Sequence, residues 1–364
     1  MKKVLFVATV VQKHIKVFHT PYLEMFRQAG YEAHVAAAND TGGEVNLPCC
    51  DRYTEIGFRR NPFHPANIGA FFRLKRLIDS EGFDLIHCHT PVGGVLGRLA
   101  AIKARRRGTK VLYTAHGFHF YKGAPLINWL IYYPVERLCA RLTDLLITIN
   151  REDYELAKTK FRAKRVEYVP GVGVDTSRFT PSREGRAQLR EALDIPESTK
   201  VILSVGELNA NKNHETVIRA IADTELYYII AGAGDRQAHL QQLASELGLG
   251  GRVKLLGYRS DIAELCRAAD VYALPSLREG LNLSLMEAMA CALPVVCSRI
   301  RGNVDLIDPE GGVMFDPRSV RECRQAIDAV LSGDMPQMGR HNLDKVRDFS
   351  AERVSGIMRD LYGL

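Results

Sequence analysis

The sequence lacks an apolar run long enough to cross a membrane. The longest candidate, residues 125–135, is far shorter than the roughly 18 residues that a spanning helix requires. The N-terminal segment MKKVLFVATV starts with basic residues, but its apolar part is brief, polar residues follow from Gln12, and no small-residue cleavage site is present. We therefore interpret this segment as a first buried strand and expect a cytoplasmic protein.

The sequence also lacks the usual cysteine and carboxylate patterns of disulfide and metal sites. Its eight cysteines show no Cys-x-x-Cys spacing, and most lie inside apolar runs, which is typical of reduced core cysteines. His87 and His89 would point to the same face of a strand, but no third ligand lies nearby in the sequence. No Asp-x-Asp motif lies near a strand end. These absences predict that no metal is bound.

Charge is distributed unevenly along the chain. Residues 1–168 contain 26 Lys and Arg against 15 Asp and Glu, whereas residues 169–364 contain 23 against 27. No basic stretch is interleaved with aromatic residues in the way that stacks bases, so we expect no nucleic-acid partner. An anionic membrane surface or a lipid-linked diphosphate accounts for the basic first half. The basic run that fits such a surface consists of Lys103, Arg105, Arg106, Arg107 and Lys110.

The length of 364 residues suggests two domains, at about 150 residues each. Short β-branched runs alternate with helix-period segments, which indicates parallel sheets and the α/β class. We expect strands at 4–8, 33–37, 84–87, 110–114, 145–148, 201–205, 227–231, 252–255, 271–274 and 294–297. The helices are expected at 67–78, 92–106, 126–142, 215–221, 237–247 and 283–291.

A stretch rich in proline and glycine interrupts this alternation. We therefore predict a Rossmann-like domain over 1–170, a linker over 171–200 and a second Rossmann-like domain over 201–348. A C-terminal helix over 349–364 is expected to pack back on the first domain. Two such sheets would face each other across a cleft, since open α/β sheets bind ligands at the carboxyl ends of their strands.

The segment 275–298 carries the clearest chemical signal. A strand ends, a loop with Glu279 and Gly280 follows, and a helix carries Glu287. The amides at the helix start can bind phosphate, and Glu287 can accept hydrogen bonds from a ribose diol. A capping acid and a solvated glutamate are the alternative, but the apolar neighbours of Glu287 argue against it. The expected amide donors are those of Gly280, Leu281, Asn282 and Leu283.

Several motifs occur in a specific order and spacing. Glu279-Gly280 and Glu287-Ala-Met-Ala are followed by Leu-Pro-Val-Val, and other matching pieces surround His87, His116, Lys212 and Gly234. Together they resemble the retaining GT-B glycosyltransferases of family four, over nearly the whole chain. The resemblance is strongest to the glycosyltransferases of bacterial capsule and exopolysaccharide synthesis.

The resemblance implies a nucleotide-sugar donor in the second domain and an acceptor in the first. Glu287 would bind the ribose, Glu279 the sugar hydroxyls and Lys212 the diphosphate. His116 would reach the donor sugar across the cleft, and His116, Glu279 and Lys212 are the expected catalytic residues. Further donor contacts would come from Gly206, Gly234, Tyr258 and Arg259, and weaker acceptor contacts from His19, His119 and Lys122. Since a cation and amides can stabilise the leaving diphosphate, we expect no metal or other cofactor.

Two departures from the family pattern affect this assignment. Glu207 stands where the family usually has an arginine for the diphosphate, so Lys212 would serve alone, or Arg278 or Arg236 would substitute. The glycine pair that usually follows the first strand is also absent, and residues 10–14, ending at His14, stand there instead.

The expected reaction is transfer from a nucleotide sugar, most simply a UDP-sugar, to a lipid-linked saccharide at the inner face of the membrane. A sugar-nucleotide 2-epimerase of the same fold and a non-catalytic nucleotide-sugar or glycan-binding protein are the alternatives. An NAD-dependent enzyme is disfavoured, because Gln237 stands where the third glycine of G-x-G-x-x-G would be.

Overall fold

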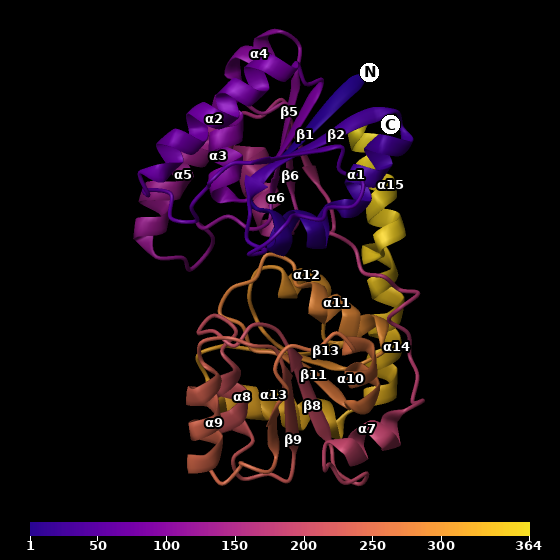
Figure 1. The fold of residues 1–364 in the computed structure, drawn as a ribbon. Helices are drawn as coiled ribbons and strands as arrows, with labels where there is room; N and C mark the ends of the chain where they lie inside the picture. Colours follow the sequence, from indigo (N-terminus) through magenta and orange to yellow (C-terminus); the bar gives the residue numbers. More distant parts are fainter. The chain divides into compact units, whose positions relative to one another are not determined.

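The computed structural model describes residues 1–364, which form two compact units (Figure 1). The first contains Met1–Val172 and Val354–Leu364, and the second contains Gly173–Arg353. Most of the segment expected as a linker, 171–200, therefore belongs to the second unit, where it includes the helix α7 (Arg186–Ala192). No helix in either unit combines the length and apolar character needed to span a membrane.

The first unit is built on a seven-stranded parallel sheet in the order β3-β2-β1-β4-β5-β6-β7. Its two central strands, β1 and β4, are almost wholly buried. The strands are β1 (Lys2–Val10), β2 (Tyr31–Ala38), β3 (Arg52–Glu55), β4 (Leu85–His89), β5 (Lys110–Ala115), β6 (Leu145–Thr148) and β7 (Arg165–Tyr168).

Helices cover both faces of this sheet. One apolar cluster packs α2, α3, α4, α5 and α6 against one face, and another packs α1 and α15 against the other. In α15, Val354, Met358 and Tyr362 recur every four residues and are buried, as expected for one apolar face of a helix. The helices are the π-helical η1 (Val11–Lys16), α1 (Thr20–Gln28), α2 (Ala66–Glu81), α3 (Pro91–Ala100), α4 (Ile102–Arg106), α5 (Leu126–Ala140), α6 (Arg151–Lys160) and α15 (Ala351–Tyr362).

The second unit repeats the plan with a six-stranded parallel sheet in the order β10-β9-β8-β11-β12-β13. The strands are β8 (Val201–Val205), β9 (Tyr227–Ala231), β10 (Val253–Leu255), β11 (Val271–Leu274), β12 (Val295–Ser298) and β13 (Gly312–Phe315). Clusters containing α7, α10 and α11 on one face and α8, α9 and α13 on the other fill its core. The helices beyond α7 are α8 (His214–Ala220), α9 (Gln237–Glu246), α10 (Ile262–Ala268), α11 (Leu283–Ala290), α12 (Asn303–Leu306), α13 (Val320–Ser332), α14 (Met335–Val346) and the 3₁₀ turn η2 (Arg347–Phe349).

The predicted α/β class with two Rossmann-like parallel sheets is confirmed, and every predicted strand is present. Three strands were not predicted, β3, β7 and β13, and each lies at an edge of its sheet. β3 and β7 are short, polar and only partly covered, so they lack a continuous apolar run. β13 is apolar but only four residues long. The helix expected at 92–106 is divided into α3 and α4. All eight cysteines are free thiols, most of them buried.

Candidate active site

The second unit has one point in its sheet where the strand order reverses direction. β8 lies between β9 and β11, so the connections from β8 and from β11 leave the sheet on opposite sides. In open α/β sheets this point, at the carboxyl ends of the strands, is where ligands bind. Lys212 follows β8 and Glu279 follows β11, and the structure brings them together there.

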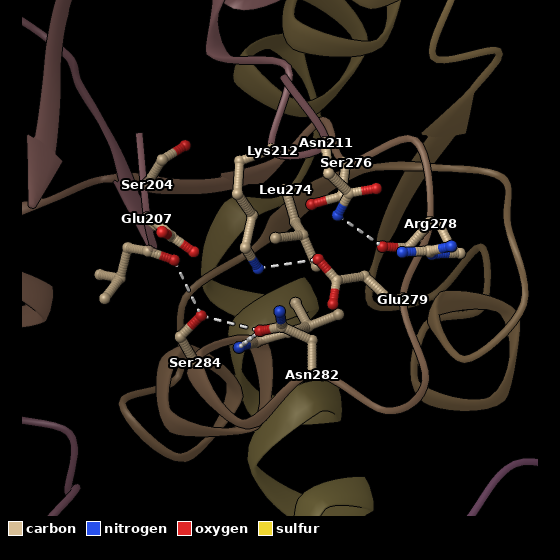
Figure 2. A network of polar contacts seen from close by, with 12 residues as sticks. Ser204, Glu207, Asn211, Lys212, Leu274, Ser276, Arg278, Glu279, Asn282 and Ser284 are labelled. Atoms are coloured by element: carbon tan, nitrogen blue, oxygen red, sulfur yellow. Dashed lines mark hydrogen bonds and ion pairs between the residues drawn. The ribbon is translucent and has the colours of Figure 1, made fainter. Parts of the chain in front are cut away.

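Lys212 and Glu279 form an ion pair, with 2.8 Å between Nζ and Oε1 (Figure 2). Their side chains are 16% and 13% exposed, so the pair is largely shielded but still accessible to a ligand. The loop around Lys212 is fixed by a hydrogen bond from its backbone N–H to Asn209 Oδ1 at 3.0 Å. On the other side, Arg301 Nε donates to the Glu279 carbonyl at 3.3 Å. Both loops are thus held in place before any ligand binds.

The start of α11 lies beside this pair. Asn282 caps the helix, since its Oδ1 accepts from the Leu285 N–H at 2.9 Å and from the Ser284 hydroxyl at 2.7 Å (Figure 2). The Ser284 hydroxyl also lies 2.7 Å from the Tyr272 hydroxyl. The first amides of a helix have no acceptor within the helix. The amides predicted for phosphate, from Gly280 to Leu283, therefore lie at the positive end of α11.

Glu287 lies one turn inside α11, among buried apolar residues. Burial raises the pKa of Glu287 to about 7, and the charge of Arg178 opposes this shift. Near neutral pH the carboxyl can therefore exist in both forms. Such a group can exchange hydrogen bonds with a pair of hydroxyls, which suits the role that the sequence predicts for it.

Gly206 and Gly234 shape the loops that follow β8 and β9. Gly206 has φ of +155°, and a Cβ there would lie 2.9 Å from Lys212 Cε. At Gly234 a Cβ would lie 2.3 Å from the Leu208 carbonyl oxygen, so no side chain fits. Gly206 thus leaves room for the Lys212 side chain, and Gly234 lets its backbone approach that of Leu208.

The residues expected to line a base slot follow β10. Gly232 N–H donates to the Gly257 carbonyl at 2.8 Å, which joins the loops after β9 and β10. Tyr258 is 84% exposed, and Arg259 pairs with Asp261 through Nε and Oδ1 at 2.7 Å.

The structure also places the cations considered as substitutes for the missing family arginine. Arg236 pairs with Glu215 at 3.2 Å, and the Arg278 side chain is exposed and directed away from Lys212 (Figure 2). Glu207 is exposed and accepts from the Asn209 side chain at 3.0 Å. Arg301, which the sequence reasoning missed, is a buried cation that contacts the loop of Glu279 through its backbone carbonyl. Its only sequence signal is its position just after β12.

In the first unit, the histidines considered in the sequence gather at the carboxyl edge of the sheet. His116 Nε2 lies 3.4 Å from His89 Nδ1, and the rings of His19 and His89 stack with centroids 3.8 Å apart. Burial lowers the pKa of His116 to about 4, so this imidazole is neutral at pH 7. Both ring nitrogens of the buried His87 have hydrogen-bond partners, since they lie 2.8 Å from the Thr114 and Tyr362 hydroxyls.

The other two expected acceptor residues lie in the loop between β5 and α5. The His119 carbonyl accepts from Asn128 Nδ2 at 2.9 Å, and the Lys122 N–H donates to Glu152 Oε1 at 2.7 Å. These contacts fix the backbone of the loop, while the Lys122 side chain is exposed.

Two parallel-sheet Rossmann-like units of this kind define the GT-B fold, and comparisons with known proteins agree. Residues 22–178 match the model of the family described as Glycosyltransferase Family 4, and residues 185–345 match Glycosyl transferases group 1. "Putative glycosyltransferase EpsD" of Bacillus subtilis (strain 168) is 46% identical over 99% of this chain and 96% of its own length.

A second relative and two solved structures extend the comparison. The Escherichia coli "UDP-Gal:alpha-D-GlcNAc-diphosphoundecaprenol alpha-1,3-galactosyltransferase" is 31% identical over 65% of this chain and 63% of its own length. Sucrose-phosphate synthase from Thermosynechococcus elongatus superposes with a TM-score of 0.82 at 21% identity, covering 100% of this chain and 98% of that one. Anabaena HepE in complex with UDP and glucose gives 0.81 at 20% identity, with 100% of both chains covered.

The chain therefore belongs to glycosyltransferase family 4, with the GT-B fold, and is a glycosyltransferase. The resemblance seen in the sequence is confirmed by the family models and by the extent of the match to EpsD.

Proposed function

We propose that this glycosyltransferase moves a sugar from a UDP-sugar to a lipid-linked saccharide during synthesis of an exopolysaccharide, capsule or related glycan. The transfer would retain the anomeric configuration, as the family resemblance implies. The observation that carries the proposal is the Lys212–Glu279 ion pair at the switch point of the second sheet, beside the start of α11.

The chemistry of the leaving group explains this arrangement. When the glycosyl–phosphate bond breaks, negative charge develops on the nucleoside diphosphate. Lys212 and the amides of residues 280–283 supply positive charge that interacts more strongly with the transition state than with the bound donor. Glu279 accepts hydrogen bonds from the sugar hydroxyls, and Glu287 binds the ribose diol. Because the cation and the amides serve the leaving group, we propose that no metal ion takes part in the transfer.

The first unit is proposed to bind the acceptor and to supply His116. A neutral His116 can donate one hydrogen bond and accept another, so it can orient a hydroxyl of the donor sugar without repelling the departing proton of the acceptor. His19, His119 and Lys122 are the proposed acceptor contacts. Lys122 is the exposed cation among them and suits an anionic acceptor diphosphate.

Two relatives support the choice of substrates. HepE has been crystallised with UDP and glucose, and the name of the Escherichia coli relative specifies a UDP-sugar donor and a diphosphoundecaprenol-linked acceptor. HepE shares the fold of this protein, and the Escherichia coli relative is identical at 31% of the aligned residues. A UDP-sugar and a lipid diphosphate are thus the substrates that this site most directly suits.

A membrane-facing surface would follow from such an acceptor. The exposed sides of α2 and α5 carry large apolar residues, and both helices pack against the same face of the first sheet. We call this surface the α2/α5 face; its apolar residues are Phe63, Ile68, Phe72, Leu126, Ile127, Leu130 and Leu138. The same two helices, and the residue that follows α5, also carry exposed arginines, namely Arg73, Arg76, Arg137 and Arg141. Apolar residues among cations suit the interface of an anionic bilayer, where we propose that the protein docks from the cytoplasm.

The proposal is tested by incubating the purified chain with radiolabelled UDP-sugars and a saccharide linked to a lipid diphosphate. We expect label to move into the lipid fraction, with or without EDTA. An epimerised nucleotide sugar, or binding without transfer, would contradict the proposed reaction. Loss of transfer in EDTA alone would contradict its metal independence.

A further inference from the structure

Four histidines of the first unit come together from separate parts of the chain. His14 lies in η1, His19 precedes α1, His89 ends β4, and His116 follows β5. The strand order of this sheet reverses between β1 and β4, so η1 and His89 leave the sheet at its own switch point. His14 occupies the segment in which the family's glycine pair is missing.

The ring nitrogens are spaced like the ligands of a small metal ion. One nitrogen from each of the four rings can be chosen so that all lie within 4.8 Å of one another. His14 Nε2 lies 3.2 Å from His19 Nε2, and His89 Nδ1 lies 3.4 Å from His116 Nε2. Zinc–nitrogen bonds of about 2.0–2.1 Å in a tetrahedron place ligand atoms about 3.3–3.4 Å apart. Two of the contacts already have this length, and the remaining pairs, all within 4.8 Å, would close on an ion placed between the rings.

Burial leaves the histidines ready to bind through lone pairs. His19 is 1% exposed and His89 is 0% exposed. The ring nitrogens of the cluster, His19 Nε2 and His89 Nδ1, contact other histidines of the set, and the opposite nitrogen of each ring has no hydrogen-bond partner. His14 and His116 are partly exposed, which gives an ion access.

We propose that His14, His19, His89 and His116 form a binding site for a transition-metal ion of the zinc type. The donor set consists of imidazoles alone, which suit Zn²⁺, Cu²⁺ and Ni²⁺ but not Mg²⁺ or Ca²⁺. Sequence reasoning expected no metal because it looked for a third ligand near His87 and His89, whereas the further ligands come from η1, the start of α1 and the loop after β5. His87 is not part of the set, since the Thr114 and Tyr362 hydroxyls engage both its nitrogens.

The proposed site shares His116 with the proposed transfer reaction. A metal ion bound to His116 would occupy a nitrogen that the reaction needs, so the metal-bound form is expected to be inhibited. This consequence rests on the proposed function, but the site itself does not, because metal binding can be measured without any sugar substrate.

The test uses the full chain, treated with chelator and then dialysed. Zn²⁺ is titrated by calorimetry and Co²⁺ by visible absorption, with His14→Asn and His116→Gln as site variants. His341→Asn is the matched control, since His341 lies in a separate, partly exposed cluster with Asp308 and Glu310. Circular dichroism verifies that each variant is folded.

We expect the wild type to bind one equivalent of Zn²⁺. Bound Co²⁺ should show the intense visible bands of tetrahedral coordination, and Zn²⁺ should displace it. Each site variant should lose more than about tenfold in affinity, because even the partners of metal ligands contribute that much, and the control should be unchanged. Equal binding by wild type and His14→Asn, loss of binding in His341→Asn, or weak octahedral Co²⁺ bands would overturn the site.

Discussion

Lys212 and Glu279 form an ion pair of 2.8 Å between the loops that follow β8 and β11. These two strands start 70 residues apart in the sequence, at Val201 and Val271, but are neighbours in the sheet. The pair holds a cation and a carboxylate side by side at the start of α11. In the proposed reaction these two groups serve different parts of one donor, the diphosphate and the sugar. Their contributions can therefore be separated by mutation.

Replacing Glu279→Gln should preserve nucleotide binding and reduce transfer. The amide keeps the size of the side chain but loses the charge that accepts from sugar hydroxyls, so we expect a fall in kcat of roughly 100-fold, the scale of one preorganised electrostatic contact. Calorimetry with UDP and initial rates of transfer measure the two effects. Normal turnover by this variant would show that Glu279 does not contact the transferred sugar.

Replacing Lys212→Ala should weaken both folding and transfer. The Glu279 carboxylate would lose its partner while remaining largely buried, which costs on the order of 1–3 kcal/mol of unfolding free energy. The double variant Lys212→Ala/Glu279→Gln should regain much of that stability but not the activity. Arg278→Ala, on the same loop as Glu279 but exposed, is the matched control. If the double variant were as active as wild type, the pair would be structural only.

Glu287 should make the stability of the second unit depend on pH. Its pKa is raised from 4.5 to about 7 on folding, so the folded state holds this proton more tightly than the unfolded state. The protonated form stabilises the fold fully below about pH 4.5, and this contribution is lost as the pH rises through 7, by on the order of 3 kcal/mol.

Glu287→Gln removes that dependence. In urea unfolding, the variant should gain stability relative to wild type between pH 4.5 and pH 8. Glu264→Gln, an exposed position on α10, should change little between these two pH values. A constant difference between wild type and Glu287→Gln across this range would show that the carboxyl is solvated.

The α2/α5 face should bind anionic bilayers. Leu126 and Leu130 are 80% and 72% exposed, and burying one leucine contributes about 1.5–3 kcal/mol. The variant Leu126→Asp/Leu130→Asp should therefore lose more than about tenfold in affinity for phosphatidylglycerol vesicles in co-sedimentation. Val17→Asp, an exposed apolar position outside this face, is the control. Equal binding of vesicles by the wild type and the double variant would show that the α2/α5 face does not contact the membrane.

Much of this organisation could be predicted from the sequence because it depends on local patterns. Buried strands such as β9 and β11 are continuous apolar runs. The positions of Lys212 and Glu279 after their strands place both at the carboxyl edge. The edge strands β3 and β7 were missed since their largely exposed, polar residues carry no such run. β13 is apolar but only four residues long and directly follows a turn with Gly311.

Contacts between distant segments could not be predicted in the same way. The position of Arg301 against the Glu279 carbonyl and the contact of His14 with His19 depend on how loops return to the sheet. The shift in the pKa of Glu287 depends on the packing around α11. Sequence motifs indicate which residues matter, whereas these distances and environments arise only in the folded chain.

The central claim is that the second unit binds a nucleoside diphosphate through Lys212, the start of α11 and Glu287. Its most direct test is a calorimetric titration of UDP into the wild type, Lys212→Ala, Glu287→Gln and the control Arg278→Ala. We predict saturable binding of one UDP by the wild type and the control, and weaker binding by both site variants. No binding of UDP by the wild type, or equal affinity in all four proteins, would contradict the claim.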